Sequence, residues 1–249
     1  MSQENILVNM FCLPPAGSSS SIYHSWNKHI PSGIKVIPLE YPGHGKKIRE
    51  NLTHDPNQLA QILCDEIKAF GNHPFILFGH SVGASVLWRI ENLLKTEKIY
   101  NNLILLAVSG RPAPSYLKIM NKKSILTVQE LINELKIYNN FPSEILNNQD
   151  TLEFFIRIIK NDFMLSDNML NDQISLTEKP LLSLYGKDDP YIDHHEMMEK
   201  WQDFSTIWLG AHAVAGDHFY FLDQATLIKT LAIISANIFK IFNTNINIR

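Results

Sequence analysis

Hydrophobic residues along this chain gather in short continuous runs, and the segments between the runs repeat hydrophobic positions every three or four residues. Six runs have the length of a β-strand: Ile6 to Leu13, Ile34 to Leu39, Phe75 to Phe78, Leu103 to Val108, Leu181 to Tyr185 and Thr206 to Leu209. Strands of a parallel sheet are buried on both faces, so they read as continuous rather than alternating hydrophobic runs. The pattern therefore predicts a mostly parallel sheet.

Helical signatures lie between the runs. Asp55 is a typical capping residue, Pro56 stands at the first helical position, and Gln58 follows three residues after the cap. Residues 84–94 follow a predicted strand directly, and a further stripe lies near the C-terminus at Leu227, Leu231, Ile234, Ile238 and Phe242. Alternation of strands and helices predicts a doubly wound α/β fold with helices on both faces of the sheet.

One region, residues 111 to about 177, breaks this alternation. It contains no convincing strand, but it has a capping box at Thr127–Glu130 and a hydrophobic-rich helical piece over residues 152–165. We expect a helical lid inserted between two strands; the alternative is a set of extra helices packed on the edge of the sheet. Residues 1–249 are interpreted as one domain that carries this insertion.

Composition narrows the class of protein. The chain has 249 residues, of which 45% are hydrophobic and 19% charged, and its net charge of −3 comes without the basic block that binds phosphates. We therefore expect no nucleic-acid partner. The N-terminal hydrophobic run breaks at Pro14 and Pro15, so a signal peptide is not expected, and no stretch approaches the length of a membrane span. Cys12 and Cys64 lie in hydrophobic patterns as buried free thiols, which favours a cytoplasmic location.

The strongest chemical signal is the sequence Gly-His-Ser-Val-Gly at residues 79–83. It follows the predicted strand at residues 75–78 and opens a helix, which is the context of a nucleophile elbow. Only small residues at Gly79 and Gly83 let strand and helix approach closely. We therefore assign Ser81 as the candidate nucleophile, with the helix N-terminus behind it offering free N–H groups.

A serine nucleophile needs a base, and the base needs an acid that orients it. In an α/β-hydrolase the acid and the histidine follow the serine in that order. His218 lies after the last predicted strand and before the C-terminal helix, so it is the preferred base, with His212 in reserve. Asp189 leaves a predicted strand and is the preferred acid, but Asp188 remains an alternative. The predicted triad is Ser81, Asp189 and His218.

The oxyanion hole needs two N–H donors, one of them from the loop after an early strand. Residues 13–18 end the first predicted strand and fit this role. Pro15 has no N–H group, which leaves Ala16 or Gly17. We expect the backbone N–H groups of Ala16 and Val82 to be the donors.

Taken in order, these motifs resemble those of type II thioesterases, which are α/β-hydrolases. The resemblance spans nearly the whole chain and rests on the Phe-Cys-Leu-Pro-Pro-Ala-Gly phrase at residues 11–17 with Trp26 downstream, the Pro-Gly segment at residues 39–45, and the motifs at 79–83, 186–190 and 216–219. Residues 157–163 loosely resemble the lid motif of that family. Three positions depart from its pattern: Ser18 for a second Gly, His44 for an Arg, and Asp217 for a Gly.

This resemblance implies an editing enzyme. Such thioesterases remove aberrant or stalled acyl groups from the phosphopantetheine arm of acyl or peptidyl carrier domains in nonribosomal peptide and polyketide synthases. The expected mechanism is acyl transfer through an acyl-serine, with no metal and no redox cofactor. Two alternatives remain: a fatty-acyl thioesterase or general carboxylesterase of the same fold, and an inactive hydrolase fold that acts as a binding module.

The lid is expected to cover the acyl group. A hydrophobic channel under it suits an acyl chain on a long arm. The residues assigned to this channel are Phe154, Phe155, Phe163, Met164 and Met169. Lys118, Lys122 and Lys123 could meet an acidic carrier domain at the rim, but a solvated face is the preferred interpretation.

Overall fold

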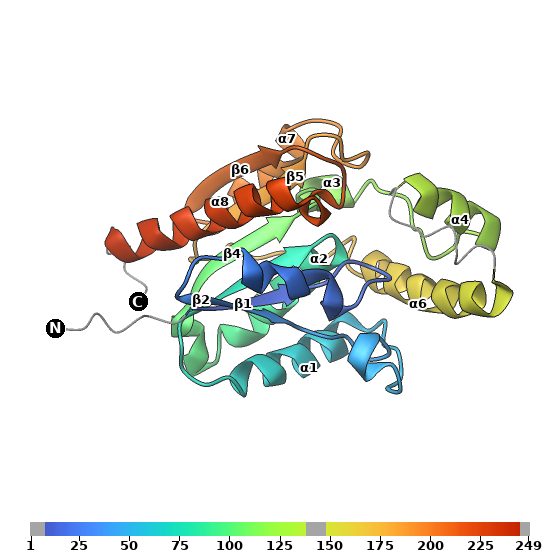
Figure 1. Cartoon of the computed structure of the whole chain (residues 1–249), viewed down its shortest axis with the longest axis horizontal. Helices are drawn as coiled ribbons and strands as arrows, with labels where there is room; N and C mark the ends of the chain where they lie inside the picture. Colours follow the sequence, from blue (N-terminus) through green and yellow to red (C-terminus); the bar gives the residue numbers. More distant parts are fainter. Residues whose placement is uncertain (1–7, 138–147, 245–249) are drawn as a thin grey trace.

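The computed structural model describes residues 8–137 and 148–244. Six parallel strands form one sheet in the order β2-β1-β3-β4-β5-β6 (Figure 1). The elements in chain order are β1 (Val8–Leu13), η1 (Ser20–Lys28), β2 (Ile34–Pro38), η2 (Gly45–Lys47), α1 (Pro56–Lys68), β3 (Phe75–His80), α2 (Val82–Leu94), η3 (Lys98–Asn102), β4 (Leu103–Ser109), α3 (Pro114–Leu117), α4 (Val128–Ile137), α6 (Gln149–Asp167), β5 (Leu181–Gly186), α7 (Glu196–Glu199), η4 (Lys200–Phe204), β6 (Trp208–Val214), η5 (Tyr220–Leu222) and α8 (Gln224–Asn243). The predicted α/β-hydrolase fold is confirmed.

Five of the six predicted strands lie where the hydrophobic runs place them, although Ile6 and Leu7 at the start of the first run are outside the described residues. The sixth is shifted, because β6 covers Trp208–Val214 instead of residues 206–209. β6 is an edge strand that pairs only with β5, and most of its side chains are half-buried. An edge strand of this kind does not need a continuous hydrophobic run, so its extent is weakly marked in the sequence.

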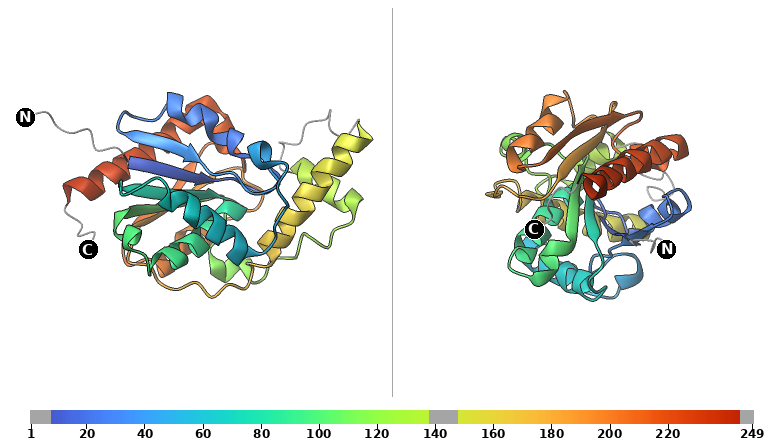
Figure 2. Two further views of the ribbon diagram at one scale, coloured as in Figure 1. Left: turned by 90° about the horizontal axis from the view of Figure 1, so that it is seen from below. Right: turned by 90° about the vertical axis from the view of Figure 1, so that its left-hand side faces the viewer.

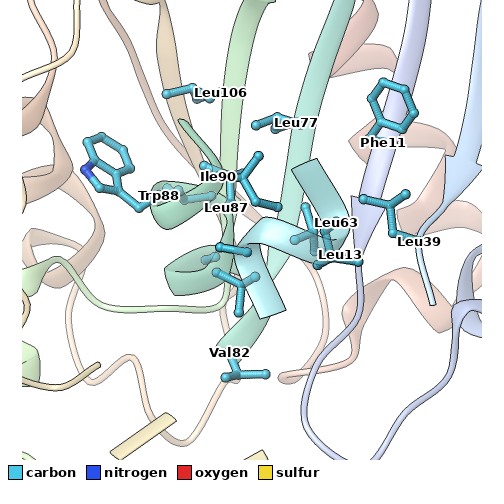
Figure 3. Close-up of a cluster of buried hydrophobic side chains, with 14 of the residues drawn as sticks. Phe11, Leu13, Leu39, Leu63, Leu77, Val82, Leu87, Trp88, Ile90 and Leu106 are labelled. Atoms are coloured by element: carbon cyan, nitrogen blue, oxygen red, sulfur yellow. The ribbon is translucent and has the colours of Figure 1, made fainter. Parts of the chain in front are cut away.

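The strands separate two hydrophobic cores. One face of the sheet packs against α1 and α2, and the other packs against η1 and α8 (Figure 2). Successive strand residues alternate between them, so that Phe11 and Leu13 lie in the first core and Met10 and Cys12 in the second. Figure 3 shows the part of the first core where side chains of α2 meet those of the strands. Both strand faces are therefore covered, which explains the continuous hydrophobic runs.

Two predicted helix starts are observed. Asp55 caps α1 by accepting hydrogen bonds from the N–H groups of Asn57 (2.8 Å) and Gln58 (3.3 Å). The capping box at α4 is reciprocal: the Glu130 carboxylate accepts from the Thr127 N–H at 2.8 Å, and the Thr127 hydroxyl accepts from the Glu130 N–H at 3.3 Å. The local sequence therefore fixes where both helices begin.

The C-terminal helix α8 is long and hydrophobic enough to cross a membrane, and it is the one helix of the described residues that meets this test. This differs from the expectation that no stretch approaches the length of a membrane span. α8 nevertheless packs one face on the sheet, with Leu227, Leu231, Ile234, Ile238 and Ile241 buried. Ile241 takes the inner position that the stripe assigns to Phe242, which is only partly buried. The hydrophobic character of α8 is thus accounted for by a core helix.

The insertion after β4 lies beyond the carboxyl ends of the strands. Within its described residues it contains α3, α4 and α6, and its one β interaction is an isolated bridge between Thr177 and Ser205. Figure 1 shows α4 and α6 at the end of the molecule opposite the start of β1. The chain leaves β1 toward β2 on one side, whereas β3 lies on the other side of β1. This reversal places the loops after β1 and β3 at a topological switch point, where open α/β sheets bind ligands.

Candidate active site

Ser81 sits on a strained turn between β3 and α2. Its backbone has φ 54° and ψ −121°, and among the described residues it is the only non-glycine residue with a positive φ. The turn needs glycine on both sides, since a Cβ atom on Gly79 would lie 2.3 Å from the Gly83 carbonyl oxygen. A strained residue of this kind is held by its surroundings and marks a functional position. The geometry therefore matches the elbow expected from the sequence.

The structure brings together the predicted acid and base. Asp189 Oδ2 lies 2.7 Å from His218 Nδ1, and both side chains are buried. The other carboxylate oxygen of Asp189 accepts a hydrogen bond from the Tyr191 N–H at 3.0 Å. Asp188 is exposed, and its backbone N–H donates to the Gly216 carbonyl. Geometry thus favours Asp189 over Asp188 as the orienting acid.

The hydrogen bond to Asp189 settles which nitrogen of His218 can act as a base. An ionised carboxylate only accepts, so Nδ1 carries the proton and Nε2 is the ring nitrogen that can accept one. His218 and Ser81 line the same pocket. The reserve histidine, His212, lies within β6 opposite Leu184, and its Nε2 is 3.2 Å from the Leu209 carbonyl oxygen. His212 does not line this pocket.

The oxyanion loop after β1 also resolves an alternative. The Gly17 N–H donates to the Asp162 carboxylate at 2.8 Å, so Gly17 is already engaged. Ala16 and Val82 both line the pocket beside Ser81. Val82 is the first residue of α2, where an N–H group has no carbonyl partner inside the helix. The N–H groups of Ala16 and Val82 therefore remain the predicted oxyanion donors, and both residues lie beside Ser81.

Lid helix α6 forms one wall of the pocket. Phe163 lines it, as predicted, together with Ser166 and Asp167 from the same helix. The other four residues assigned to the channel do not reach it: Phe154 and Met164 are exposed, Phe155 is partly buried beside Phe154, and Met169 packs into the core around α2. The helical period is the reason, because positions 154 and 164 lie on a different face of α6 from position 163. The prediction that these four residues line the acyl channel is therefore wrong for this structure.

The second lid helix contacts the loop that carries the acid. The Tyr191 hydroxyl donates to Glu134 of α4 at 2.6 Å, and Lys123 pairs with Glu134 at 2.5 Å. Lys123 also lies 3.8 Å above the Tyr191 ring and lines the pocket, whereas Lys118 and Lys122 are exposed. The preferred interpretation of a solvated lysine face therefore suits Lys118 and Lys122 but not Lys123. The sequence gives no signal for Tyr191, because its partners come from distant parts of the chain.

Two of the three departures from the family pattern have local explanations. The Asp217 carboxylate accepts the Phe219 N–H at 2.9 Å, so it shapes the turn that carries His218. His44 is buried and its Nε2 lies 2.9 Å from Asp162 Oδ2. The sequence alone does not indicate a contact between His44 and Asp162. Among the described residues, no group of three or more His, Cys, Asp and Glu side chains is placed to hold a metal ion.

Comparison with known proteins agrees with this geometry. A model of the thioesterase domain family matches residues 9–237, which is most of the chain. The chain belongs to the thioesterase domain family. This thioesterase is therefore an enzyme of the serine hydrolase class, and the elbow, the acid and the histidine lie inside the matched region.

Individual relatives of this thioesterase have low sequence identity to it, but the similarity extends over most of the chain. The gramicidin S biosynthesis protein GrsT of Aneurinibacillus migulanus is 25% identical over 217 residues, covering 87% of this chain and 84% of its own. The medium-chain S-acyl fatty acid synthase thioesterase of Rattus norvegicus is 28% identical over 230 residues, with coverages of 88% and 84%. A solved structure of the type II thioesterase BorB, from the borrelidin biosynthetic cluster, superposes with a TM-score of 0.78 at 25% identity and 92% coverage of both chains.

Proposed function

We propose that this thioesterase is a type II editing enzyme that hydrolyses acyl groups from the phosphopantetheine arm of carrier domains in nonribosomal peptide or polyketide synthesis. The observation that carries the proposal is the hydrogen bond from His218 to Asp189, which orients the imidazole in the pocket that His218 and Ser81 line together. A buried acid, an oriented imidazole and a strained serine form a complete acyl-transfer site rather than a binding module.

The chemistry follows from the placement of the protons. His218 Nε2 takes the proton of the Ser81 hydroxyl while the serine oxygen attacks the thioester carbonyl carbon. The negative oxygen that forms is stabilised by the N–H groups of Ala16 and Val82. The carbon–sulfur bond then breaks, and His218 returns the proton to the leaving thiolate. Water, deprotonated by the same nitrogen, hydrolyses the acyl-serine and releases the carboxylic acid and free Ser81.

The strained backbone of Ser81 and the orientation of His218 supply the positioning. Since Asp189 holds Nδ1–H, the imidazolium that forms in each step is stabilised without a change of tautomer. The side chains of Asp189 and His218 are both buried, so water screens the interaction between them only weakly.

The substrate class is supported by the lid and by the relatives. The pocket has a cavity volume of about 40 Å³, far below the roughly 300–1,000 Å³ of a typical ligand site. We therefore expect α4 and α6 to move apart when an acyl group on its arm enters. GrsT and BorB are proteins of gramicidin S and borrelidin biosynthesis, which favours a carrier-bound substrate for this chain. We also propose a cytoplasmic location, which the two buried free thiols favour.

A second function has specific support. The rat relative acts in fatty acid synthesis by its name, so release of medium-chain fatty acyl groups is the alternative for this chain. The catalytic residues would be the same in both cases, and only the acyl group and the carrier would differ.

The deciding experiment compares substrates that share one acyl group. Purified protein is given acetyl, butyryl and octanoyl groups on a peptidyl carrier domain, on coenzyme A, and as p-nitrophenyl esters. An editing enzyme is expected to show its highest kcat/KM on the carrier domain, with short chains accepted at least as well as octanoyl. A preference for octanoyl over acetyl on every carrier supports the fatty-acyl alternative. A preference for the oxygen esters would contradict both functions.

A further inference from the structure

A buried carboxylate in lid helix α6 joins three segments that are distant in the sequence. Asp162 is 1% exposed, and its Oδ2 accepts the Gly17 N–H of the oxyanion loop at 2.8 Å. The same oxygen lies 2.9 Å from Nε2 of His44, in the segment after β2. Its other oxygen accepts from the Asn161 side-chain amide at 3.2 Å. A charged group buried this deeply must be paired, and here the pairing connects the lid to the catalytic loop.

The contacts of His44 show that it carries a positive charge. Its Nδ1 lies 3.0 Å from the Pro42 carbonyl oxygen, which can only accept, so Nδ1 must bear a hydrogen. Its Nε2 faces a carboxylate oxygen, which also accepts. Both ring nitrogens therefore donate, and His44 forms an ion pair with Asp162 inside the protein.

The charges around His44 agree with this protonation. Burial alone lowers the pKa of His44, but the hydrogen bond and charge of Asp162, the Pro42 carbonyl and the charge of Glu40 outweigh it, and the pKa is raised above the usual 6.5. Tyr41 packs its ring 5.9 Å from that of His44, and its own pKa is raised well above 10 by burial, so it stays neutral. The charged groups that face His44 are thus Asp162 from α6 and Glu40 from its own segment.

The oxyanion loop is held on both sides of Ala16. The carbonyl oxygens of Leu13 and Pro14 accept hydrogen bonds from the hydroxyls of Tyr23 (2.8 Å) and Tyr41 (3.1 Å). These two anchors come from the body of the enzyme and precede Ala16. The first anchor after Ala16 is the Gly17 N–H, which is held by the lid. The Pro15 carbonyl, which shares a peptide plane with the Ala16 N–H, accepts from the Ser18 N–H at 3.2 Å and so closes a turn around Ala16. The direction of the Ala16 N–H therefore depends on the placement of this turn, which Asp162 anchors through Gly17.

Packing at Gly17 requires the same docking of the lid. Gly17 has φ +71°, and a Cβ atom there would lie 2.7 Å from Ile159 of α6. α6 thus fits closely over the loop, one helical turn before Asp162. A shift of the helix would remove both the packing and the hydrogen bond.

We propose that Asp162, paired with the charged His44, is a positioning residue that orients the Ala16 N–H toward the oxyanion, so that the hole is complete only while α6 is docked. This rests on the proposed roles of Ser81 and Ala16 and goes beyond them.

One consequence of the proposal is that kcat depends on the pH. As the pH rises through the raised pKa of His44, the ion pair is lost and kcat falls.

The first test measures kcat and KM for an acetyl-N-acetylcysteamine thioester, with the melting temperature as a check on folding. Asp162→Asn should lower kcat about 100-fold, because that is the loss caused by removing one oxyanion donor. KM should change less than about threefold. The matched control is Asp172→Asn, which removes the charge of a partly buried carboxylate that pairs with Arg89 away from the pocket. It is expected to keep kcat within about twofold. A folded Asp162→Asn protein with the kcat of the wild type would overturn the proposal.

The second test compares the pH dependence of kcat between the wild type and two variants of His44. His44→Arg keeps a permanent positive charge, so it should retain activity at pH 7 and lose the alkaline fall in kcat, whereas His44→Gln should be slow at every pH. Identical alkaline limbs in wild type and His44→Arg would contradict the proposal. A p-nitrophenyl phosphonate that labels Ser81 gives a readout independent of substrate class. If the wild type hydrolyses no thioester, the proposed function is rejected. If Asp162→Asn is then still labelled more slowly than the wild type, the positioning role of Asp162 is supported independently.

Discussion

Gly83 approaches Leu13 so closely that a Cβ atom on Gly83 would lie 2.4 Å from the Leu13 carbonyl oxygen and 2.9 Å from that of Pro14. These neighbours are backbone atoms that cannot move aside like a side chain. The contact brings the start of α2 against the end of β1, and each of these segments carries one of the two oxyanion donors. The spacing of the two donors is thus set by a glycine.

Gly83→Ala is therefore expected to damage both folding and catalysis. Overpacking of this kind costs about 1–3 kcal/mol, and separation of the donors should lower kcat by about tenfold or more. The measurements are a melting curve and thioester turnover. Gly71→Ala is the control, because a Cβ there would meet nothing within 4 Å. Its positive φ should lower the melting temperature alone; an unchanged kcat in a folded Gly83→Ala protein would refute the account of the hole.

Asp189→Asn is expected to reduce kcat by a factor of about 10⁴, which is the loss found when the triad aspartate of a serine protease is replaced by asparagine. The amide cannot hold His218 in the required tautomer or stabilise its charged form. Asp188→Asn should leave kcat within about twofold, since that side chain is exposed. Both variants are compared by turnover of the same thioester, and the opposite ranking would transfer the orienting role to Asp188.

Phe163→Ala should weaken acyl binding, because Phe163 lines the pocket and is only 6% exposed. Loss of this hydrophobic surface is expected to raise KM for an octanoyl thioester by about tenfold, with a smaller effect on the acetyl thioester. Phe154→Ala removes the same ring from the exposed face of α6, where 39% of the residue is accessible, and should change neither KM. Equal effects of the two variants would show that Phe163 acts through the stability of the lid.

Local sequence patterns account for much of the fold. Continuous hydrophobic runs predict the buried strands, and the caps at Asp55 and Thr127 predict helix starts that the structure reproduces. The extent of the edge strand β6 is predicted wrongly because most of its residues, Trp208–Val214, are only half-buried and form no continuous hydrophobic run. The elbow at Ser81 could be predicted because its strand, turn and helix are adjacent in the chain.

Other features of the site depend on long-range packing. The choice between Ala16 and Gly17, which sequence left open, is made by Asp162 from a helix 145 residues away. Four of the five lid residues expected in the channel point elsewhere, because the hydrophobic content of α6 does not reveal which face meets the pocket. The pair of His44 and Asp162 is likewise invisible in the sequence, where 118 residues separate its members.

The most direct test of the central claim follows the acyl group itself. Wild-type protein and Ser81→Ala are mixed with an acetyl-loaded carrier domain, and intact-protein mass spectrometry records the carrier and the enzyme over time. We predict that the wild type frees the carrier thiol and passes through an acetylated enzyme, whose modified peptide contains Ser81. Ser81→Ala, with an unchanged melting temperature, should lose several decades of rate and form no such species. Release of the carrier at the wild-type rate by folded Ser81→Ala would contradict the account.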